Sequence, residues 1–285
     1  MTKVWRWAGY VVIACLSSIT LAAAALWLVA AYKLNARIVA KPEHLVIPNS
    51  ALLADGPRQL RVLGCMECHG EGLRGSIVID DPNLARLYAP NLTLVAAGAT
   101  DQQLATAIRQ GVSIDGRPLV LMPSAQYSRL NDAQVSALIA AIRALPRGGV
   151  EMPPRRLGPI GIVGLATGQF YTAPQLVQDD ARNLPIDLGP QFARGRELVM
   201  VSCSECHGPK LEGTELEPGL RTPDLAVAAG YDLPQFMHFM RTGIASGNRH
   251  LPIMSTRARD AFSNYRDDEI ASIHAYLVAR ANLQH

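Results

Sequence analysis

The chain has 285 residues, of which 49% are hydrophobic and 18% charged, with a net charge of +3 and a pI near 8.6. This charge is too small to indicate a nucleic-acid-binding protein, and no basic patch interleaved with aromatic residues is present in the sequence. The length gives room for two small domains and additional segments.

The first predicted element is a membrane-spanning helix over residues 7–32, which contain no charged residue. At 1.5 Å per residue these 26 residues form a helix of about 39 Å, longer than the hydrocarbon core of about 30 Å. Tryptophan and tyrosine residues lie near both ends, as in the aromatic belts of membrane helices. A cleaved signal peptide has a shorter apolar core, so we expect residues 1–32 to be a retained anchor.

Cys15 lies inside this apolar stretch and has two interpretations. Residues 12–15 resemble a lipoprotein cleavage box, which would make Cys15 a lipid anchor. The sequence remains apolar for seventeen residues after Cys15, whereas a lipoprotein turns polar there. A small, unreactive hydrophobic residue is therefore the favoured interpretation. Residues 33–55, with Pro42 and Pro48, are predicted to be a tether.

The pattern Cys-x-x-Cys-His occurs twice, at Cys65–His69 and at Cys203–His207. It is typical of covalent haem c attachment: two thiols add to the vinyl groups of the porphyrin, and the histidine binds the iron. A zinc site would bring its second cysteine pair within a few tens of residues, whereas these pairs are 138 residues apart. A thioredoxin-like redox pair needs no histidine after its second cysteine and lies near a βαβ pattern, which surrounds neither of these boxes.

We therefore predict two covalently bound haem c groups. The scarcity of aromatic residues, 6% of the sequence, agrees with small cores that are filled partly by porphyrin. The predicted attachment residues are Cys65, Cys68, Cys203 and Cys206, and the predicted iron ligands on the first face are His69 and His207.

The sequence around the two boxes forms a tandem repeat. Both boxes continue as His-Gly-x-x-Leu-x-Gly, and a Pro-Asn or Pro-Asp pair follows in each half. Next comes a helix, which in the first half has a predicted capping box at Thr100 and Gln103. The helices end near Arg109 and Arg241, and an amphipathic helix closes each half. We predict two domains, 56–146 and 191–285, joined by an irregular proline-rich linker, 147–190.

The linker contains the apolar run Ile160–Leu165, which is far too short to cross a bilayer. We expect this run to pack across the interface between the two domains. A partner-binding patch is the alternative.

The sixth iron ligand decides whether each haem transfers electrons or reacts with a substrate. Met122 and Met254 are the candidates, because each follows its helix-end arginine by thirteen residues, and each is expected in a loop that folds over the haem. A lone methionine is otherwise core filler. The second half contains rival residues, namely His250, Met237, His238 and Met240.

The surroundings of the iron-binding histidines can also be predicted. A metal-bound histidine usually donates its other ring N–H to a carbonyl or carboxylate group. The backbone carbonyls of Pro90 and Pro223 are the predicted acceptors. Contacts to the haem propionates are expected either from Asn91 and Asp224 or from Arg109 and Arg241, although an arginine at a helix C-terminus also favours the helix dipole.

These motifs resemble a known family, the membrane-bound multihaem cytochromes c similar to the cytochrome subunit of bacterial periplasmic alcohol and gluconate-type dehydrogenases. The resemblance rests on Cys-x-x-Cys-His-Gly-x-x-Leu-x-Gly, on Ala89–Leu92 and on Arg109–Pro123, and it covers most of residues 55–285. It implies an all-α fold, in which two tandem class-I-like cytochrome c domains with histidine and methionine ligands follow the transmembrane helix. Members of that family commonly have three haems, whereas this chain has two boxes, and Ser255 replaces proline after Met254.

The resemblance implies a dihaem cytochrome c that relays single electrons from a partner dehydrogenase to a respiratory acceptor, such as a quinone, a cytochrome or an oxidase. No catalytic residues are predicted. Two alternatives stay open: a dihaem enzyme with one open haem (a peroxidase or sulfur-compound oxidase), and the cytochrome c subunit of a terminal oxidase. Because bacteria attach haem c outside the cytoplasmic membrane, the expected location is the inner membrane, with the haem domains in the periplasm.

Overall fold

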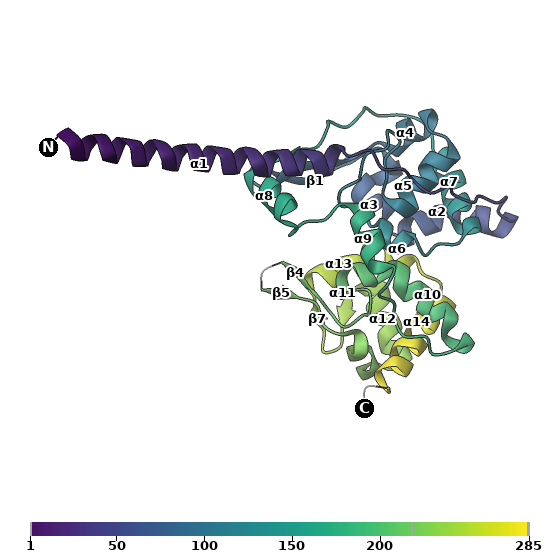
Figure 1. Ribbon diagram of the computed structural model, residues 1–285. Coiled ribbons are helices and arrows are strands. Elements are labelled where there is room, and N and C mark those ends of the chain that lie inside the picture. The colour runs from purple at the N-terminus through teal and green to yellow at the C-terminus, as the bar shows by residue number, and fades with distance from the viewer. Residues whose placement is uncertain (1, 218, 284–285) are drawn as a thin grey trace.

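The computed structural model describes residues 2–217 and 219–283, and it contains a long N-terminal helix and two stacked helical units (Figure 1). Helix α1 (Thr2–Asn35) projects from the body. The first unit comprises residues 50–145 and the second comprises residues 190–283. Short antiparallel strands lie at the edges, so the fold is mostly helical rather than all-α.

Two helices, α2 and α7, form the centre of the first unit. Leu60 on α2 and Val135 and Ile139 on α7 are fully buried between them. The unit contains α2 (Ser50–Val62), α3 (Cys65–His69), η1 (Glu71–Leu73), β1 (Ser76–Asp81), β2 (Ala85–Ala89), α4 (Leu92–Gly98), α5 (Asp101–Gln110), α6 (Ser124–Tyr127) and α7 (Asp132–Ala144). The predicted capping box of Thr100 and Gln103 is confirmed at the start of α5.

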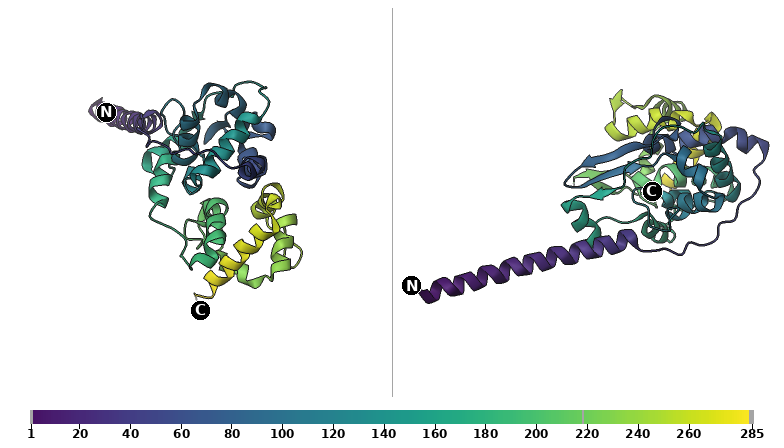
Figure 2. Two further views of the ribbon diagram at one scale, coloured as in Figure 1. Left: turned by 90° about the vertical axis from the view of Figure 1, so that its right-hand side faces the viewer. Right: turned by 90° about the horizontal axis from the view of Figure 1, so that it is seen from above.

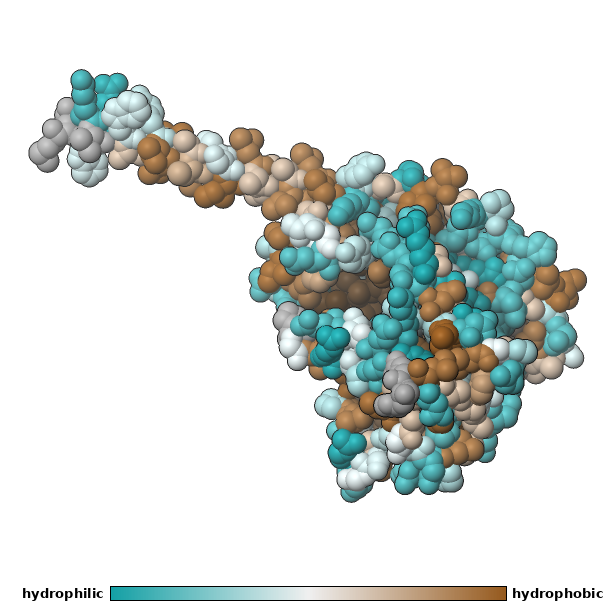
Figure 3. All heavy atoms as spheres, turned by 60° about the horizontal axis from the view of Figure 1, so that its bottom comes forward, coloured by the Kyte–Doolittle hydropathy of each residue, from teal (hydrophilic) through white to brown (hydrophobic). Residues whose placement is uncertain are grey.

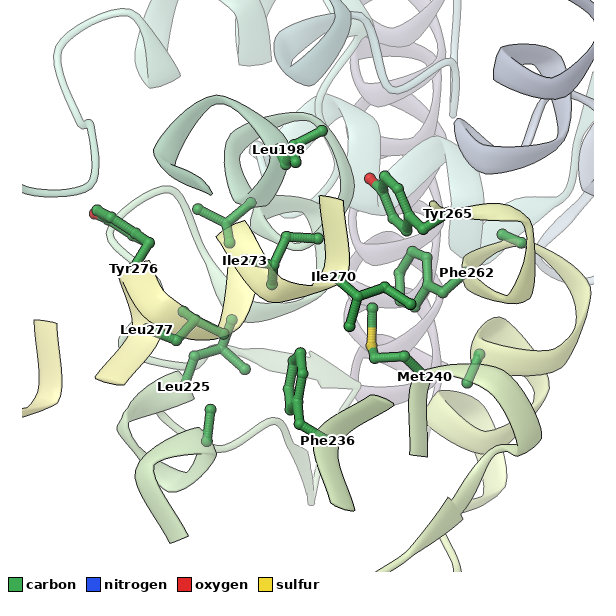
Figure 4. Close-up of a cluster of buried hydrophobic side chains, with 14 of the residues drawn as sticks. Leu198, Leu225, Phe236, Met240, Phe262, Tyr265, Ile270, Ile273, Tyr276 and Leu277 are labelled. Atoms are coloured by element: carbon green, nitrogen blue, oxygen red, sulfur yellow. The ribbon is translucent and has the colours of Figure 1, made fainter. Parts of the chain in front are cut away.

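The second unit is built around a similar helix pair, α10 and α14. Figure 4 shows its core, in which Ile270 and Ile273 of α14 lie near Phe236 and Met240 of α12. The unit contains η2 (Pro190–Phe192), α10 (Ala193–Ser202), α11 (Ser204–His207), β4 (Glu215–Glu217), β5 (Leu220–Arg221), η3 (Leu225–Gly230), α12 (Leu233–Thr242), β6 (Ile244–Ala245), β7 (Arg249–His250), α13 (Pro252–Asp260), η4 (Phe262–Asn264) and α14 (Asp267–Ala281).

The predicted tether is neither free nor as long as expected. Helix α2 begins at Ser50, six residues before the predicted domain start, because the Asn49 side chain accepts the Leu52 N–H at 2.9 Å and caps it. The preceding extended residues lie along the first unit, where Glu43 forms an ion pair with Arg109. The tether therefore holds α1 in a fixed position on the first unit.

The connecting segment is more regular than predicted. It contains β3 (Arg156–Leu157), which extends the β1–β2 hairpin, and two helices, α8 (Pro159–Thr167) and α9 (Ala173–Asp180). The apolar run Ile160–Leu165 lies in α8, which packs against α1 instead of across the interface between the units, so that expectation was wrong. Helix α8 also lies close to the β1–β2 hairpin, because Gly161 lies against the Leu84 carbonyl, where a side chain would collide. Helix α9 packs against α6.

At the interface between the units, α2 packs against η4 of the second unit, and α10 packs against α6 of the first unit. Each unit places a valine in the other's core: Val62 of α2 belongs to the second core, and Val201 of α10 belongs to the first. Figure 2 shows the two units one above the other when viewed from the side opposite the projecting helix. The exchanged valines make the two units one packed body.

Candidate haem centres

The first Cys-x-x-Cys-His box forms the short helix α3 directly after α2. Its histidine, His69, is only 7% exposed, and its Nδ1 atom lies 2.8 Å from the carbonyl oxygen of Pro90, the acceptor predicted from the sequence. Because Nδ1–H donates to this carbonyl, the lone pair of Nε2 is free to bind iron. Burial lowers the pKa of His69, so the ring is neutral at physiological pH.

The second box repeats this arrangement. His207 is 8% exposed, and its Nδ1 atom lies 2.9 Å from the carbonyl oxygen of Pro223. Burial lowers its pKa also, although the hydrogen bond to Pro223 and the charge of Asp224 partly oppose this. Both histidines therefore have the tautomer and protonation state of a metal ligand.

The loops after the boxes have the same backbone geometry. The carbonyl oxygen of His69 accepts the Gly75 N–H at 2.7 Å, and that of His207 accepts the Gly213 N–H at 2.8 Å. The leucine of His-Gly-x-x-Leu-x-Gly adopts a left-handed conformation in both loops, with φ of 57° at Leu73 and 66° at Leu211. Both leucines are fully buried, so core packing outweighs the cost of about 1–2 kcal/mol of this conformation. The repeat seen in the sequence is thus a repeat of structure.

The thiols of both boxes suit covalent attachment of haem. The box cysteines are unpaired, and the first cysteine of each box packs against the core of its own unit. Within residues 2–217 and 219–283, no three His, Cys, Asp or Glu side chains are grouped so that they could hold a metal ion. Two thiols, a neutral histidine and an apolar core fit haem c.

The two predicted methionine ligands occupy different local structures. Met122 lies in the loop before α6, as expected, but Met254 lies in the first turn of α13, because Pro252 starts a helix there. The loop expected at Met254 was therefore wrong. Both side chains are half-buried and pack against the same core as the first cysteine of their box. Iron ligation by Met122 and Met254 stays a prediction.

The rival ligands in the second unit have other positions. His238 on α12 and His250 on β7 are exposed to solvent. Met240 is buried in the centre of the core, and Met237 packs at the core's margin. None of these four has the position in the chain that corresponds to Met122.

The arginines predicted to contact propionates hold the last helix of each unit. Arg109 pairs with Asp132, the first residue of α7, at 2.9 Å, and Arg241 pairs with Asp267, the first residue of α14, at 2.6 Å. A carboxylate at a helix N-terminus is favourable in itself, and the arginine links it to α5 in the first unit and to α12 in the second. Both guanidinium groups thus have carboxylate partners within the protein, and their propionate contacts stay predictions.

Asn91 and Asp224 also have structural roles. Asn91 is 2% exposed, caps α4 by accepting the Thr93 N–H, and donates to the Gly148 carbonyl at 2.8 Å. Asp224 caps η3 and pairs with Arg280 at 2.6 Å. Because these residues follow Pro90 and Pro223, the caps fix the carbonyls that orient the histidines.

The two boxes lie next to each other across the interface between the units. Arg257, on α13 of the second unit, forms an ion pair with Glu67 inside the first box, and its guanidinium covers Gly64. In the amide orientation that satisfies its neighbours, Gln126 of the first unit accepts the Glu205 N–H of the second box at 2.8 Å. Neither Arg257 nor Gln126 belongs to a motif, and sequence reasoning did not find them.

Charge in one box also acts on a thiol of the other box. Burial raises the pKa of Cys68, and the charge of Glu205 in the other box raises it further. The two attachment sites therefore share one electrostatic environment.

The second unit defines a class of domain, the cytochrome c domain. The family model for cytochrome c matches residues 192–280, which include nearly all of the second unit. No curated protein matches the chain. Residues 192–280 form a cytochrome c domain, which carries at least one haem c attached through Cys203 and Cys206 and functions in haem-based electron transfer.

The N-terminal helix is the remaining functional element. Within the described residues, Trp5–Asn35 is the one helix that is long and apolar enough to cross a membrane. Such a helix is either an anchor or a signal sequence, and cytochrome c domains are extracytoplasmic.

Proposed function

We propose that the protein is a membrane-anchored periplasmic dihaem cytochrome c of the inner membrane. It relays single electrons from a partner dehydrogenase to a respiratory acceptor and has no substrate of its own. Each haem, when bound, accepts and releases one electron at its iron. On this proposal the first unit is a second cytochrome c domain, with Cys65 and Cys68 as attachment residues.

The observation that carries the proposal is the equal geometry of the two boxes. His69 and His207 are equally buried, with the same hydrogen bond to a proline carbonyl, and they are followed by the same left-handed leucine. The family model matches only the second unit, and the first unit repeats its box, its histidine hydrogen bond and the buried leucine that follows. The same backbone supports the same chemistry.

The contact between the boxes supports a relay. Arg257 and Gln126 each reach from one unit into the box of the other, so the attachment cysteines lie at the interface. An electron that enters through one haem therefore has a short path to the other. One unit is then free to face the donor while the other faces the acceptor.

Retention of α1 is supported by its contacts with the body. Ala30 is 2% exposed, Lys33 donates to the Leu165 carbonyl at 2.7 Å, and Arg155 donates to the Leu34 carbonyl at 2.7 Å. A signal sequence that is removed during export would leave these partners of the mature protein unsatisfied. We therefore favour an anchor.

The number and type of haems are tested on protein purified in mild detergent. We expect two haems per chain by intact mass and by pyridine haemochrome absorbance. The variant Cys65→Ser/Cys68→Ser should contain one haem, as should the matched variant Cys203→Ser/Cys206→Ser. A wild-type chain with a single haem would refute the dihaem proposal.

Carbon monoxide separates a relay from an enzyme. If methionines complete both coordination spheres, CO added to the reduced protein leaves both haem spectra nearly unchanged. A strong spectral shift in one haem would favour a dihaem enzyme with an open iron. In that case we would test Met254 first, because it lies in a helix and not in the expected loop.

The partner is tested by purification from native membranes, followed by mass spectrometry of the bound proteins. Copurification of a dehydrogenase subunit is the expected result. An oxidase core in its place would make the chain the cytochrome c subunit of a terminal oxidase. A protein that purifies alone would contradict a stable dehydrogenase complex.

A further inference from the structure

Helix α8 presents an apolar surface that the electron-transfer site does not use. The surrounding stretch, residues 157–178, contains no charged residue. Ile160 is 58% exposed and Val163 is 42% exposed, and they lie three residues apart on one side of the helix. Gly161 and Leu165, on the opposite side, are buried against the protein.

The position of α8 along α1 fixes its depth relative to a membrane. It contacts α1 near Ala30 and Lys33, at the end of the uncharged stretch that begins at residue 7. That stretch is about 9 Å longer than the hydrocarbon core, equivalent to about six residues. Trp27 and Tyr32, on the same part of α1, are 57% and 75% exposed, as expected of aromatic residues at the membrane interface. Helix α8 therefore lies at the boundary between acyl chains and headgroups.

The polar backbone groups at both ends of α8 have partners within the protein. Lys33 Nζ donates to the Leu165 carbonyl at 2.7 Å and to the Ala166 carbonyl at 3.3 Å, so it caps the C-terminal end. At the N-terminal end, the Ile160 N–H donates to the Asn83 carbonyl at 2.9 Å. A helix needs such hydrogen-bond partners for its terminal backbone groups in a region that is poor in water.

We propose that α8 is a second membrane contact, an interfacial helix that lies in the outer headgroup region beside α1, with Ile160 and Val163 directed to the acyl chains. This rests on the proposed retention of α1 as an anchor. The occupant is lipid because α8 packs against α1, whose projecting apolar surface (Figure 3) lipid must cover. Two side chains bind weakly alone, but beside α1 they fix the orientation of the haem units to the membrane.

The experiment uses the full haem-loaded chain in phospholipid nanodiscs, with an environment-sensitive fluorophore attached to single thiols. In a Cys15→Ala background, Val163→Cys is labelled and compared with Leu53→Cys, whose native side chain is equally exposed at 42%. Leu53 lies on α2, at the far end of the body from the free end of α1 (Figure 1). Brominated lipids quench labels that lie within the bilayer.

We expect brominated lipids to quench the Val163→Cys label several-fold more than the Leu53→Cys label. Equal, weak quenching at both positions would overturn the inference. Shielding of the Val163→Cys label that depends on the ratio of protein to lipid would also overturn it, since a second copy of the chain would then be the occupant.

The native thiol of Cys15 separates this inference from the anchor proposal. A labelled Cys15 in otherwise unchanged protein reports on α1 alone. Quenching at Cys15 without quenching at Val163→Cys leaves the anchor intact and refutes the contact of α8. Loss of α1 from the mature chain, detected by intact mass, refutes the anchor and the inference that rests on it.

Discussion

Glu269 joins the two units through a buried charge, and replacing it should cost much of the protein's stability. Its side chain is 1% exposed and lies 2.8 Å from Arg58 of the first unit. Arg194 and Arg266 approach the same carboxylate at 3.1 Å and 3.2 Å. The change Glu269→Gln keeps the shape of the side chain and removes its charge, so three arginines lose a common partner.

The structure gives the size of the effect. Removing one partner of a buried ion pair costs about 3–5 kcal/mol, because a desolvated charge is left without compensation. Arg58 keeps a second partner in Asp55, at 2.6 Å, and its own side chain is 22% exposed. The loss in the free energy of unfolding should therefore lie near the lower end, at about 3 kcal/mol.

The assay is urea unfolding in detergent at pH 7, followed by far-ultraviolet circular dichroism and by haem absorbance. The matched control is Glu71→Gln, whose partner is Arg61 in an exposed pair with side chains 77% and 43% exposed. This control should lose less than about 1 kcal/mol. If Glu269→Gln is no more destabilising than Glu71→Gln, the reasoning about a buried linking charge is wrong.

Three further predictions concern the haem environment and pH. Replacing Arg257 with methionine removes a positive charge beside the first box. Because this charge favours the reduced state, its loss should lower the midpoint potentials by tens of millivolts in a redox titration. The control Arg259→Met, an exposed change on the same helix, should leave the midpoint potentials unchanged. Met122→Ala should abolish the near-infrared methionine-to-iron band of one haem and let that haem bind CO, whereas an unchanged spectrum would exclude Met122 as a ligand. The hydrogen bond from Arg58 lowers the pKa of Asp55 from 3.8 to about 2. The ionised carboxylate therefore stabilises the fold above pH 4, and this contribution is lost as the pH falls from about 4 to 2. Over that range, the Asp55→Asn variant should lose less stability in urea unfolding than the wild-type protein does.

Features that depend on neighbouring residues could be predicted from the sequence. The Cys-x-x-Cys-His boxes, the capping box at Thr100 and the proline carbonyls that orient His69 and His207 all follow from short spacings. Such patterns act through local geometry and covalent chemistry, so the repeat in the sequence already predicts two similar sites.

Features that depend on packing between distant segments could not be predicted. Residues 147–190 are predicted to be irregular because they contain many prolines and glycines, yet α8 forms where its apolar residues meet α1. Arg109 and Arg241 are suited by charge to propionates, and each also pairs with the aspartate that begins the last helix of its unit. Several partners compete for such a side chain, and only the folded chain decides which is nearest.

The sequence by itself determined the residues that carry the chemistry of this protein: two Cys-x-x-Cys-His boxes and an apolar helix that can cross a membrane. The tertiary structure decided how these parts are placed relative to one another. Arg257 reaches Glu67 from 190 residues away, and Val62 enters the core of the other unit. Contacts over such separations arise from the shape and charge of two folded surfaces, which no local pattern in the sequence encodes.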